Sequence, residues 1–235
     1  MDVDTAIAAA YLRATGKTTT LASTSAKYLR LFGLLKYFTR ERARERGVNW
    51  NDLYDPDLSI GTVTATDTYD LDSTIMKLSD REGDFVRIFH DDDVAITDYT
   101  IVPANTLKDH FWGQNKESYS GFYCAQMGTT LVFNHKFTST DPQFGGDIQV
   151  PCHVFPEELT TGTDELQCPD PDWLVVRAAA EYVRNDITRQ NQYSNLLSEA
   201  NEKMQAMKDE NDGQIITIDR PWTPLSGIGS DSAWS

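Results

Sequence analysis

The first residues that suggest chemistry are Gly16, Lys17 and Thr18, which resemble the end of a phosphate-binding loop. That loop requires another glycine five residues before the Gly-Lys pair, where this chain has Tyr11, and it follows a strand. Here a helix is expected before Gly16, because residues 6–12 are strong helix formers. The sequence therefore predicts no nucleotide site at this position.

A run of three aspartates, Asp91, Asp92 and Asp93, follows His90 and offers carboxylates to a hard cation. A calcium-binding loop alternates its acidic ligands with other residues and carries a central glycine, and this run does neither. We interpret the run as a solvated turn between two strands.

The three cysteines, Cys124, Cys152 and Cys168, form no CxxC pair, which is typical of reduced thiols in a protein made in a cytosol. Cys152 and His153 are neighbours on an expected strand, so their side chains point to opposite faces and would not share a metal. No serine has a GxSxG context, and no histidine stands in HExxH. The 36 acidic residues offer many pairs for hydrolysis, but their spacing selects none. We predict no catalytic, cofactor-binding or metal-binding residue, and a protein that is not an enzyme.

Composition excludes several classes of protein. The chain has 235 residues and a mass of 26.5 kDa, which is enough for one or two domains with a sizeable core. Aromatic residues make up 11%, too many for a disordered chain. Acidic residues outnumber basic ones, 36 to 21, and the net charge of −15 argues against a general nucleic-acid binder. The sequence has no apolar run of about 18 residues and no basic leader, so neither a membrane span nor a signal peptide is expected.

The charge is unevenly distributed along the chain. Residues 1–50 hold nine Lys or Arg side chains and four acidic ones, a charge of +5, so the other residues carry −20. Such a bipolar chain can associate head to tail with copies of itself in a ring or filament. A mixed-charge helix beside an acidic, solvated body explains the pattern equally well.

Residues 1–58 are expected to form an N-terminal helical part. Asp2 or Asp4 can cap a first helix that ends at Gly16. A second helix begins near Ser23–Ser25, whose hydroxyls suit an N-cap, and carries one apolar stripe at spacings of three and four. The stripe consists of Tyr28, Leu31, Leu35 and Phe38.

The end of this second helix is expected at the charged segment RERARER, residues 40–46. Opposite charges alternate there, which is typical of a solvated helical end, and Gly47 is a suitable stop. Residues 48–60 contain the Asn, Asp and Pro side chains of a turn-rich connector.

Residues 59–159 are expected to form a small antiparallel β-barrel or sandwich. Six short stretches are rich in β-branched or alternating apolar residues and are separated by turn signals. These stretches are residues 62–68, 84–90, 95–102, 121–125, 130–137 and 147–155.

Residues 160–212 are expected to complete the helical body with one long helix. Asp170 is a suitable N-cap, Pro171 suits the first helical position, and apolar residues recur on one face as far as Met207. A helix over residues 172–211 would be about 60 Å long at 1.5 Å per residue, with a possible kink at the polar residues 189–192.

The last segment, residues 213–235, combines prolines and glycines with large apolar side chains, so we expect an extended arm. Such an apolar tail is expected to be buried, either on a partner or on its own domain. The arm residues expected to contact a partner are Ile215, Ile216, Ile218, Trp222, Leu225, Ile228 and Trp234.

Three stretches of the chain resemble the head-to-tail adaptor proteins of tailed bacteriophages. This family, also called connector or head-completion proteins, includes the tail tubular A type. The stretches are RERARERGVNWNDLYDPDLSIGTVTATDTYDL, GGDIQVPCHVFPEEL and CPDPDWLVVRAAAEYVRNDITRQNQYSNLLSEANEKMQAMKDEN, the last followed by the apolar tail. The likeness covers about residues 25–225, and residues 1–20 do not match.

The resemblance implies an α+β fold, with a helical body, an inserted β domain and a C-terminal arm. Proteins of this family form a ring, usually of twelve subunits, which lies under the portal, extends the DNA channel and docks tail components. By position, the arm 213–235 would bind the portal, and the second helix and the helix 172–211 would line the ring interfaces or the channel. The arginines assigned to these helices are Arg40, Arg42, Arg44, Arg46, Arg177, Arg184 and Arg189.

The implied location is the neck of the virion, after synthesis in the host cytoplasm. The implied partners are the portal protein, a tail nozzle or tube protein, further copies of the chain, and genomic DNA that passes without sequence-specific binding. No cofactor and no membrane partner are expected. Two alternatives stay open: another neck or tail-completion component that binds the tail tube, and a soluble enzyme or small-ligand module that uses the β domain as its pocket.

Overall fold

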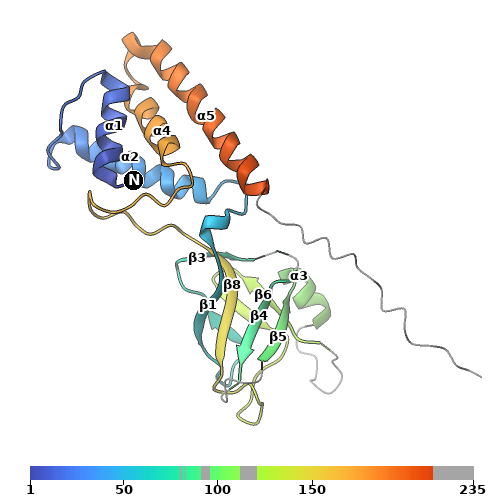
Figure 1. The fold of residues 1–235 in the computed structure, drawn as a ribbon. Coiled ribbons are helices and arrows are strands. Elements are labelled where there is room, and N and C mark those ends of the chain that lie inside the picture. Colours follow the sequence, from blue (N-terminus) through green and yellow to red (C-terminus); the bar gives the residue numbers. More distant parts are fainter. Residues whose placement is uncertain (80, 82, 91–95, 112–120, 214–235) are drawn as a thin grey trace, which may run out of the picture.

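The chain folds into a helical body and a β-sheet unit that meet at one junction (Figure 1). The structure is a computed structural model that describes residues 1–79, 81, 83–90, 96–111 and 121–213. The described part combines several helices, including a long C-terminal one, with a curled and mostly antiparallel sheet. This architecture confirms the predicted α+β class.

The helical elements are α1 (Val3–Thr15), α2 (Ala26–Ala43), η1 (Asn51–Leu53), α3 (Ala104–Thr106), the π-helical turn η2 (Leu107–Phe111), α4 (Pro171–Val183), η4 (Ile187–Arg189) and α5 (Gln190–Gly213). The strands are β1 (Tyr54–Thr62), β2 (Thr68–Asp70), β3 (Ile75–Leu78), β4 (Phe85–Phe89), β5 (Ile96–Ile101), β6 (Tyr123–Met127), β7 (Thr130–Phe133) and β8 (Asp147–Val154). Among the described helices, none is both long enough and apolar enough to cross a membrane.

The two N-terminal helices begin where the sequence predicts. The Asp2 carboxylate accepts a hydrogen bond from the backbone N–H of Thr5 at 2.7 Å and caps α1. Gly16 ends α1 with a φ of 70°, a left-handed conformation that glycine adopts without strain. The Ser25 hydroxyl caps α2, and the predicted stripe of this helix is buried.

The prediction of a single helix over residues 172–211 is wrong, because the chain reverses direction within this segment and forms a helical hairpin. α4 ends at Val183, and α5 packs back against it after the turn η4. The Asp186 carboxylate accepts hydrogen bonds from the backbone N–H and the hydroxyl of Thr188, and the Gln190 side chain donates to the carbonyl of Arg184. Side chain–backbone bonds of this kind compete with helical ones and end the helix.

Helix α4 is the centre of the helical body, since it contacts α1, α2 and α5. Three consecutive alanines, Ala178, Ala179 and Ala180, are fully buried and let the neighbouring helices approach closely. Larger side chains such as Trp173 and Leu174 fill the same core. The apolar residues predicted to lie on one long helix are therefore buried, but they belong to the two helices α4 and α5.

The β unit has eight described strands, where the sequence predicted six. The sheet order is β1-β8-β4-β5-β6-β7-β2, with β3 also paired to β8, and all pairs are antiparallel except β5 with β6. Strand β1 begins at Tyr54, inside the segment 48–60 predicted as a connector, so that prediction is wrong from Tyr54 onward. The register of β1 shifts between Asp55 and Leu58, and this irregularity accommodates Pro56 in a strand.

The inside of the curled sheet is an apolar core of its own. Tyr99, Phe133 and Phe137 are fully buried there and contact one another edge to face, with ring centroids 4.8 Å to 6.2 Å apart. This core is separate from that of the helical body. Each unit therefore has its own hydrophobic centre.

Asparagines connect the two units at the junction. The side chain of Asn211, at the end of α5, donates to the carbonyl of Asn49 at 3.0 Å and accepts from the backbone N–H of Asn51 at 2.9 Å. The side-chain oxygens of Asn49 and Asn51 in turn accept hydrogen bonds from Lys77 and Arg81 of the β unit. The connector before β1 thus links α5 to the sheet.

Candidate subunit-contact surface

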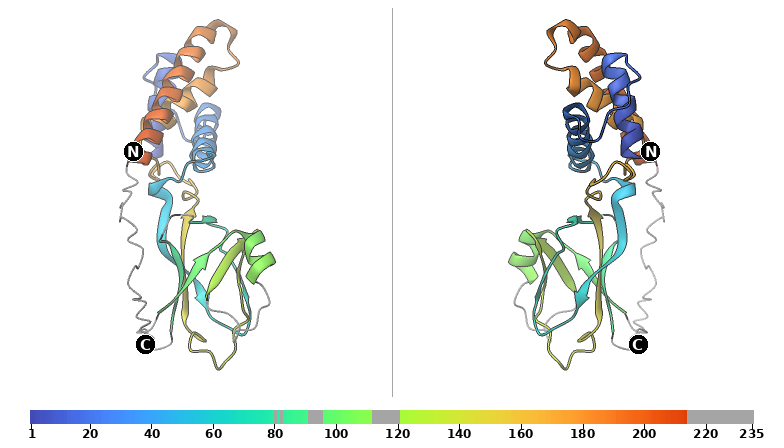
Figure 2. Two further views of the ribbon diagram at one scale, coloured as in Figure 1. Left: turned by 90° about the vertical axis from the view of Figure 1, so that its right-hand side faces the viewer. Right: turned by 90° about the vertical axis from the view of Figure 1, so that its left-hand side faces the viewer.

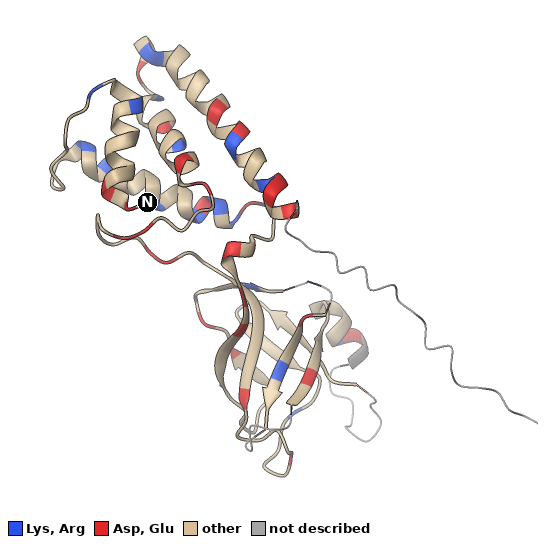
Figure 3. Cartoon of the chain, in the orientation of Figure 1, with Lys and Arg blue, Asp and Glu red and all other residues tan. Residues whose placement is uncertain are grey.

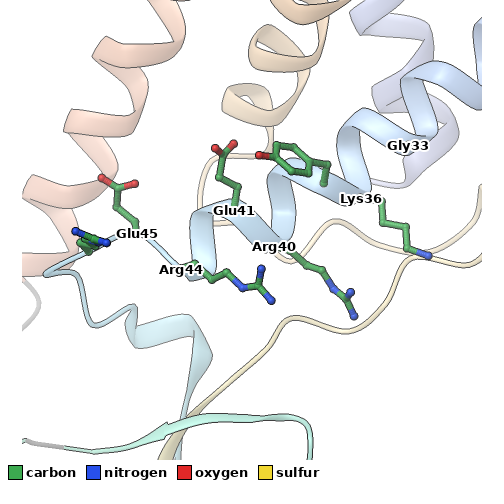
Figure 4. Close-up of a pocket in the computed structure, with 8 residues that line it drawn as sticks. Gly33, Lys36, Arg40, Glu41, Arg44 and Glu45 are labelled. Atoms are coloured by element: carbon green, nitrogen blue, oxygen red, sulfur yellow. The ribbon is translucent and has the colours of Figure 1, made fainter.

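The side of α2 that points away from the core forms an exposed surface. Leu29 and Tyr37 lie on it and are 56% and 59% exposed. Gly33 lies one helical turn from each of them and leaves open space where a side chain would stand. A hollow of about 690 Å³ follows this side of the helix (Figure 4). We use the name outward α2 face for Leu29, Gly33, Lys36, Tyr37, Arg40 and Arg44.

The charges along this surface are sorted by side. Figure 4 shows that Lys36, Arg40 and Arg44 project to one side of α2, whereas Glu41 and Glu45 project to the other. Exposed apolar side chains grouped beside arginines are typical of a surface that binds another protein.

Part of this charge is satisfied within the chain. Lys36 pairs with Glu158, and the hydrogen bond from Lys36 lowers the pKa of the Glu158 carboxyl. Glu45 pairs with Lys208 of α5 at 2.6 Å. Within the described residues, Arg40 forms no ion pair, and its charge acts on the Glu158 carboxyl only from a distance, where it helps to lower the pKa.

Arg44 and Arg46 are the other predicted arginines that line the hollow. The Arg44 guanidinium lies over the ring of Phe155, 5.3 Å from its centroid, yet the residue stays exposed. Arg46 is exposed just beyond the end of α2. The structure therefore brings three of the seven predicted arginines together with the outward α2 face.

The interface role predicted for Arg42 is wrong, because this side chain is fully buried. Its guanidinium donates to both carboxylate oxygens of Asp52, at 3.1 Å and 2.6 Å, and to the carbonyl of Gln167 at 3.1 Å. It also lies 4.8 Å from the ring of Trp50, whose indole N–H donates to the Arg42 carbonyl. Arg42 binds α2 to the connector and to the segment before α4, and it cannot reach another subunit.

The three remaining arginines contact their own chain, away from the outward α2 face. Arg177 of α4 is half-buried over the ring of Phe38, 4.8 Å from its centroid. Arg189 pairs with Asp186 at 3.2 Å and also donates to the C-terminal turn of α1. Arg184 is exposed at the end of α4 and pairs with Glu181 at 2.9 Å.

All of the predicted arm contacts lie outside the described residues. Of the arm 213–235, the structure describes Gly213, which ends α5. These arm residues are Ile215, Ile216, Ile218, Trp222, Leu225, Ile228 and Trp234. Their contact with a portal protein stays a prediction.

The sequence reasoning missed the apolar part of the outward α2 face. A signal was present, because Leu29, Gly33 and Tyr37 are four residues apart and lie opposite the buried stripe. A helix with a second, exposed apolar row is expected to contact something beyond its own core.

The residues that suggested nucleotide, thiol or metal chemistry in the sequence are next. Gly16 caps α1 and is preceded by a helix, as expected for a segment that is not a phosphate-binding loop. Cys152 is buried in the core of the sheet, and burial raises the pKa of its thiol to about 12. Within the described residues, no group of three His, Cys, Asp or Glu side chains could hold a metal. The aspartates 91–93 lie outside the described residues.

Comparisons with known proteins assign no family. No protein-family model matches the chain. No curated protein matches it either. The interpretation of the outward α2 face therefore rests on its own geometry and charge.

Proposed function

We propose that the chain is a structural protein of the neck of a tailed bacteriophage, where it forms a ring that joins the portal to the tail. The observation that carries the proposal is the outward α2 face, where Leu29 and Tyr37 are more than half exposed beside Arg40. Tyrosine and arginine are enriched among the residues that anchor protein interfaces. The resemblance to head-to-tail adaptors suggests the assembly in which such a surface would be used.

The two-part architecture supports the same role. The helical body carries the outward α2 face on its flank, and the β unit extends from one end of that body (Figure 1). A subunit of this shape can pack side by side with its neighbours while the β unit meets a tail nozzle or tube protein. Lateral contact and tail contact would then use different surfaces.

The charge of the chain suits a wall of the DNA channel. The net charge is −15, and Asp and Glu outnumber Lys and Arg over the described β unit (Figure 3). Like charges repel, so DNA would slide past such a wall without binding. The proposed role needs no catalytic step and no cofactor.

The proposal assigns portal docking to the arm 213–235. Its isoleucines and tryptophans suit pockets on a partner, and the arm follows α5 directly at Gly213. The proposed site of action is the virion neck, with about twelve copies in the ring, as the resemblance implies.

The test is negative-stain electron microscopy of the protein mixed with the portal encoded in the same genome. We expect a second ring stacked on the portal, and its loss when the chain is truncated after Asp212. The double variant Trp222→Ala/Trp234→Ala should weaken binding, whereas the matched arm variant Ser226→Ala/Ser230→Ala should bind like the wild type.

The outcomes separate the two parts of the proposal. Bare portals with a folded full-length chain would contradict the portal role and favour a tail-completion component. A ring formed by the truncated chain would contradict the arm assignment alone. Circular dichroism of the truncated chain checks that its helices are retained.

A further inference from the structure

The side of α5 that points away from the core is acidic. Glu202, Asp209 and Asp212 are exposed along it, and within the described residues none of them forms an ion pair. The two lysines of α5 pair with acids of their own chain. The exposed residues nearer the start of the helix are small and uncharged: Asn191, Asn195 and Ser198. We use the name outward α5 face for these six residues.

The two outward faces lie on opposite flanks of the helical body. α4 packs against both α2 and α5, and each of these helices turns its buried stripe toward the common core. The exposed sides of the two helices therefore point in different directions. Figure 2 shows α2 and α5 on opposite sides of the body in both views.

The charged ends of the two faces lie at the same level of the molecule. The ion pair between Glu45 and Lys208, at 2.6 Å, brings the C-terminal end of α2 to that of α5 beside the β unit. Arg40 lies in the last turn of α2, Arg44 is its C-cap, and Asp209 lies in the last turns of α5. Charges of both signs are visible around these helix ends in Figure 3.

We propose that the outward α2 face of one copy binds the outward α5 face of the next copy, which rests on the proposed ring and identifies its lateral interface. The arginines would meet Glu202, Asp209 and Asp212, and Leu29 and Tyr37 would cover the small residues at the start of α5. Complementary patches at one level on opposite flanks are what a closed head-to-tail ring requires. A two-fold contact between parallel α2 helices is disfavoured, because it would bring the arginines together.

Charge reversal on the portal-bound ring tests this pairing. Arg40→Glu/Arg44→Glu should lower the number of complete rings on portals by about tenfold or more, and so should Glu202→Lys/Asp209→Lys. The control Lys108→Glu/Lys136→Glu makes the same change in net charge as the arginine variant, at exposed sites of the β unit, and should leave ring formation unchanged.

Mixing the two reversed variants distinguishes direct pairing from a general effect of charge. Each variant alone repels its own copies, whereas an alternating mixture places opposite charges at every interface. The mixture should therefore restore rings. Rings formed by Arg40→Glu/Arg44→Glu alone, or a mixture that stays unassembled, would overturn the pairing while leaving the portal role intact.

A disulfide test needs no portal and so separates this inference from the proposed function. Leu29 and Ser198 are exposed on the two outward faces; of the native cysteines, Cys124 and Cys152 are fully buried, whereas Cys168 is partly exposed. In a chain that carries Cys168→Ser, oxidation at high concentration should link Leu29→Cys/Ser198→Cys into a ladder of oligomers, and each single variant should give dimers at most. The ladder without portal rings would support the interface and contradict the portal role, and the absence of a ladder would overturn the interface.

Discussion

The buried Arg42 is a residue whose loss should strongly destabilise the fold. Its guanidinium bonds both oxygens of Asp52 and the carbonyl of Gln167, and it stacks on Trp50. Arg42→Ala removes these contacts and leaves a cavity and an unpaired carboxylate, so the free energy of unfolding should fall by about 3 kcal/mol. Urea unfolding followed by circular dichroism measures the change.

Arg44 provides the matched control, because it is an exposed arginine two residues away. Arg44→Ala should change the free energy of unfolding by less than about 0.5 kcal/mol. If Arg42→Ala and Arg44→Ala lowered the free energy of unfolding equally, the buried contacts of Arg42 would add no stability beyond that of an exposed arginine.

The carboxylate of Asp164 should make stability depend on pH. It accepts hydrogen bonds from the hydroxyl of Thr161 and from the backbone N–H groups of Thr160 and Thr161, which hold the pKa of Asp164 well below its ordinary 3.8. The folded chain favours the ionised form, so this stabilisation is complete above about pH 4 and is lost as the pH falls further. The free-energy difference between wild type and Asp164→Asn should be constant from about pH 5 to 7 and shrink below about pH 4.

Urea unfolding of both proteins at each pH measures this difference. A difference that stays the same at low pH would contradict the assignment. The loop around Asp164 also holds the start of α1, since the carbonyls of Gly162 and Asp164 accept the backbone N–H groups of Asp4 and Val3. We therefore expect amide exchange in the first turn of α1 to quicken in Asp164→Asn.

The burial of Arg42 could not be predicted from the sequence. Arg42 continues the buried stripe of α2, four residues after Phe38, but the alternating charges around it favoured a solvated position. Its partner Asp52 lies beyond the end of the helix, and no spacing rule connects the two residues. The burial of an arginine depends on such a distant partner, which the pattern of a single helix does not contain.

The N-cap of α2 is a prediction at the scale of the element. The sequence left Ser23, Thr24 and Ser25 as candidates, and the structure selects Ser25, whose hydroxyl accepts from the backbone N–H of Tyr28 at 3.2 Å. Ser25→Ala should lower the free energy of unfolding by about 1 kcal/mol. Ser23→Ala, at an exposed position before the helix, should change it by only a few tenths.

Thermal and urea unfolding of the two serine variants decide the point. If Ser23→Ala were the more damaging change, the helix would begin earlier than the structure places it. Caps of this kind are local, which is why the starts of α1, α2 and α4 could be predicted from short stretches.

The helical hairpin and strand β1 show where local patterns failed. The apolar face of α4 and α5 has the same period on both sides of residue 186, so periodicity alone favoured one long helix. In β1, Pro56 and its neighbouring aspartates favoured a turn, but pairing with β8 stabilises an irregular strand. The pairing of β1 with β8 is a tertiary contact that a short window of sequence does not show. At the hairpin, the local bonds of Asp186 with Thr188 outweighed the apolar period.

For the whole molecule, the order of the elements was sufficient to predict a helical body interrupted by a β unit. The parallel pairing of β5 with β6 and the return of β3 to β8 depend on contacts between distant segments. The outward α2 face became recognisable once the other side of α2 was known to be buried against α4. Once one side of α2 is known to be buried, the opposite side is the one that remains exposed for a partner.

The last prediction concerns the coupling of the helical body to the β unit. Asn211 is 6% exposed, and its side chain joins α5 to Asn49 and Asn51, which in turn bind Lys77 and Arg81. Asn211→Ala removes the side-chain bonds to the Asn49 carbonyl and from the Asn51 backbone N–H, and should cost about 2 kcal/mol. The bond from the Asn51 side chain to the backbone carbonyl of residue 211 remains.

Because each unit has its own apolar core, this loss should also weaken the cooperativity between them. Calorimetry should show one thermal transition for the wild type and two for Asn211→Ala. Asn201→Ala, an exposed substitution of the same type on the same helix, should keep the single transition. A single transition in Asn211→Ala would mean that the chain connections, and not the asparagine contacts, make the two units unfold together.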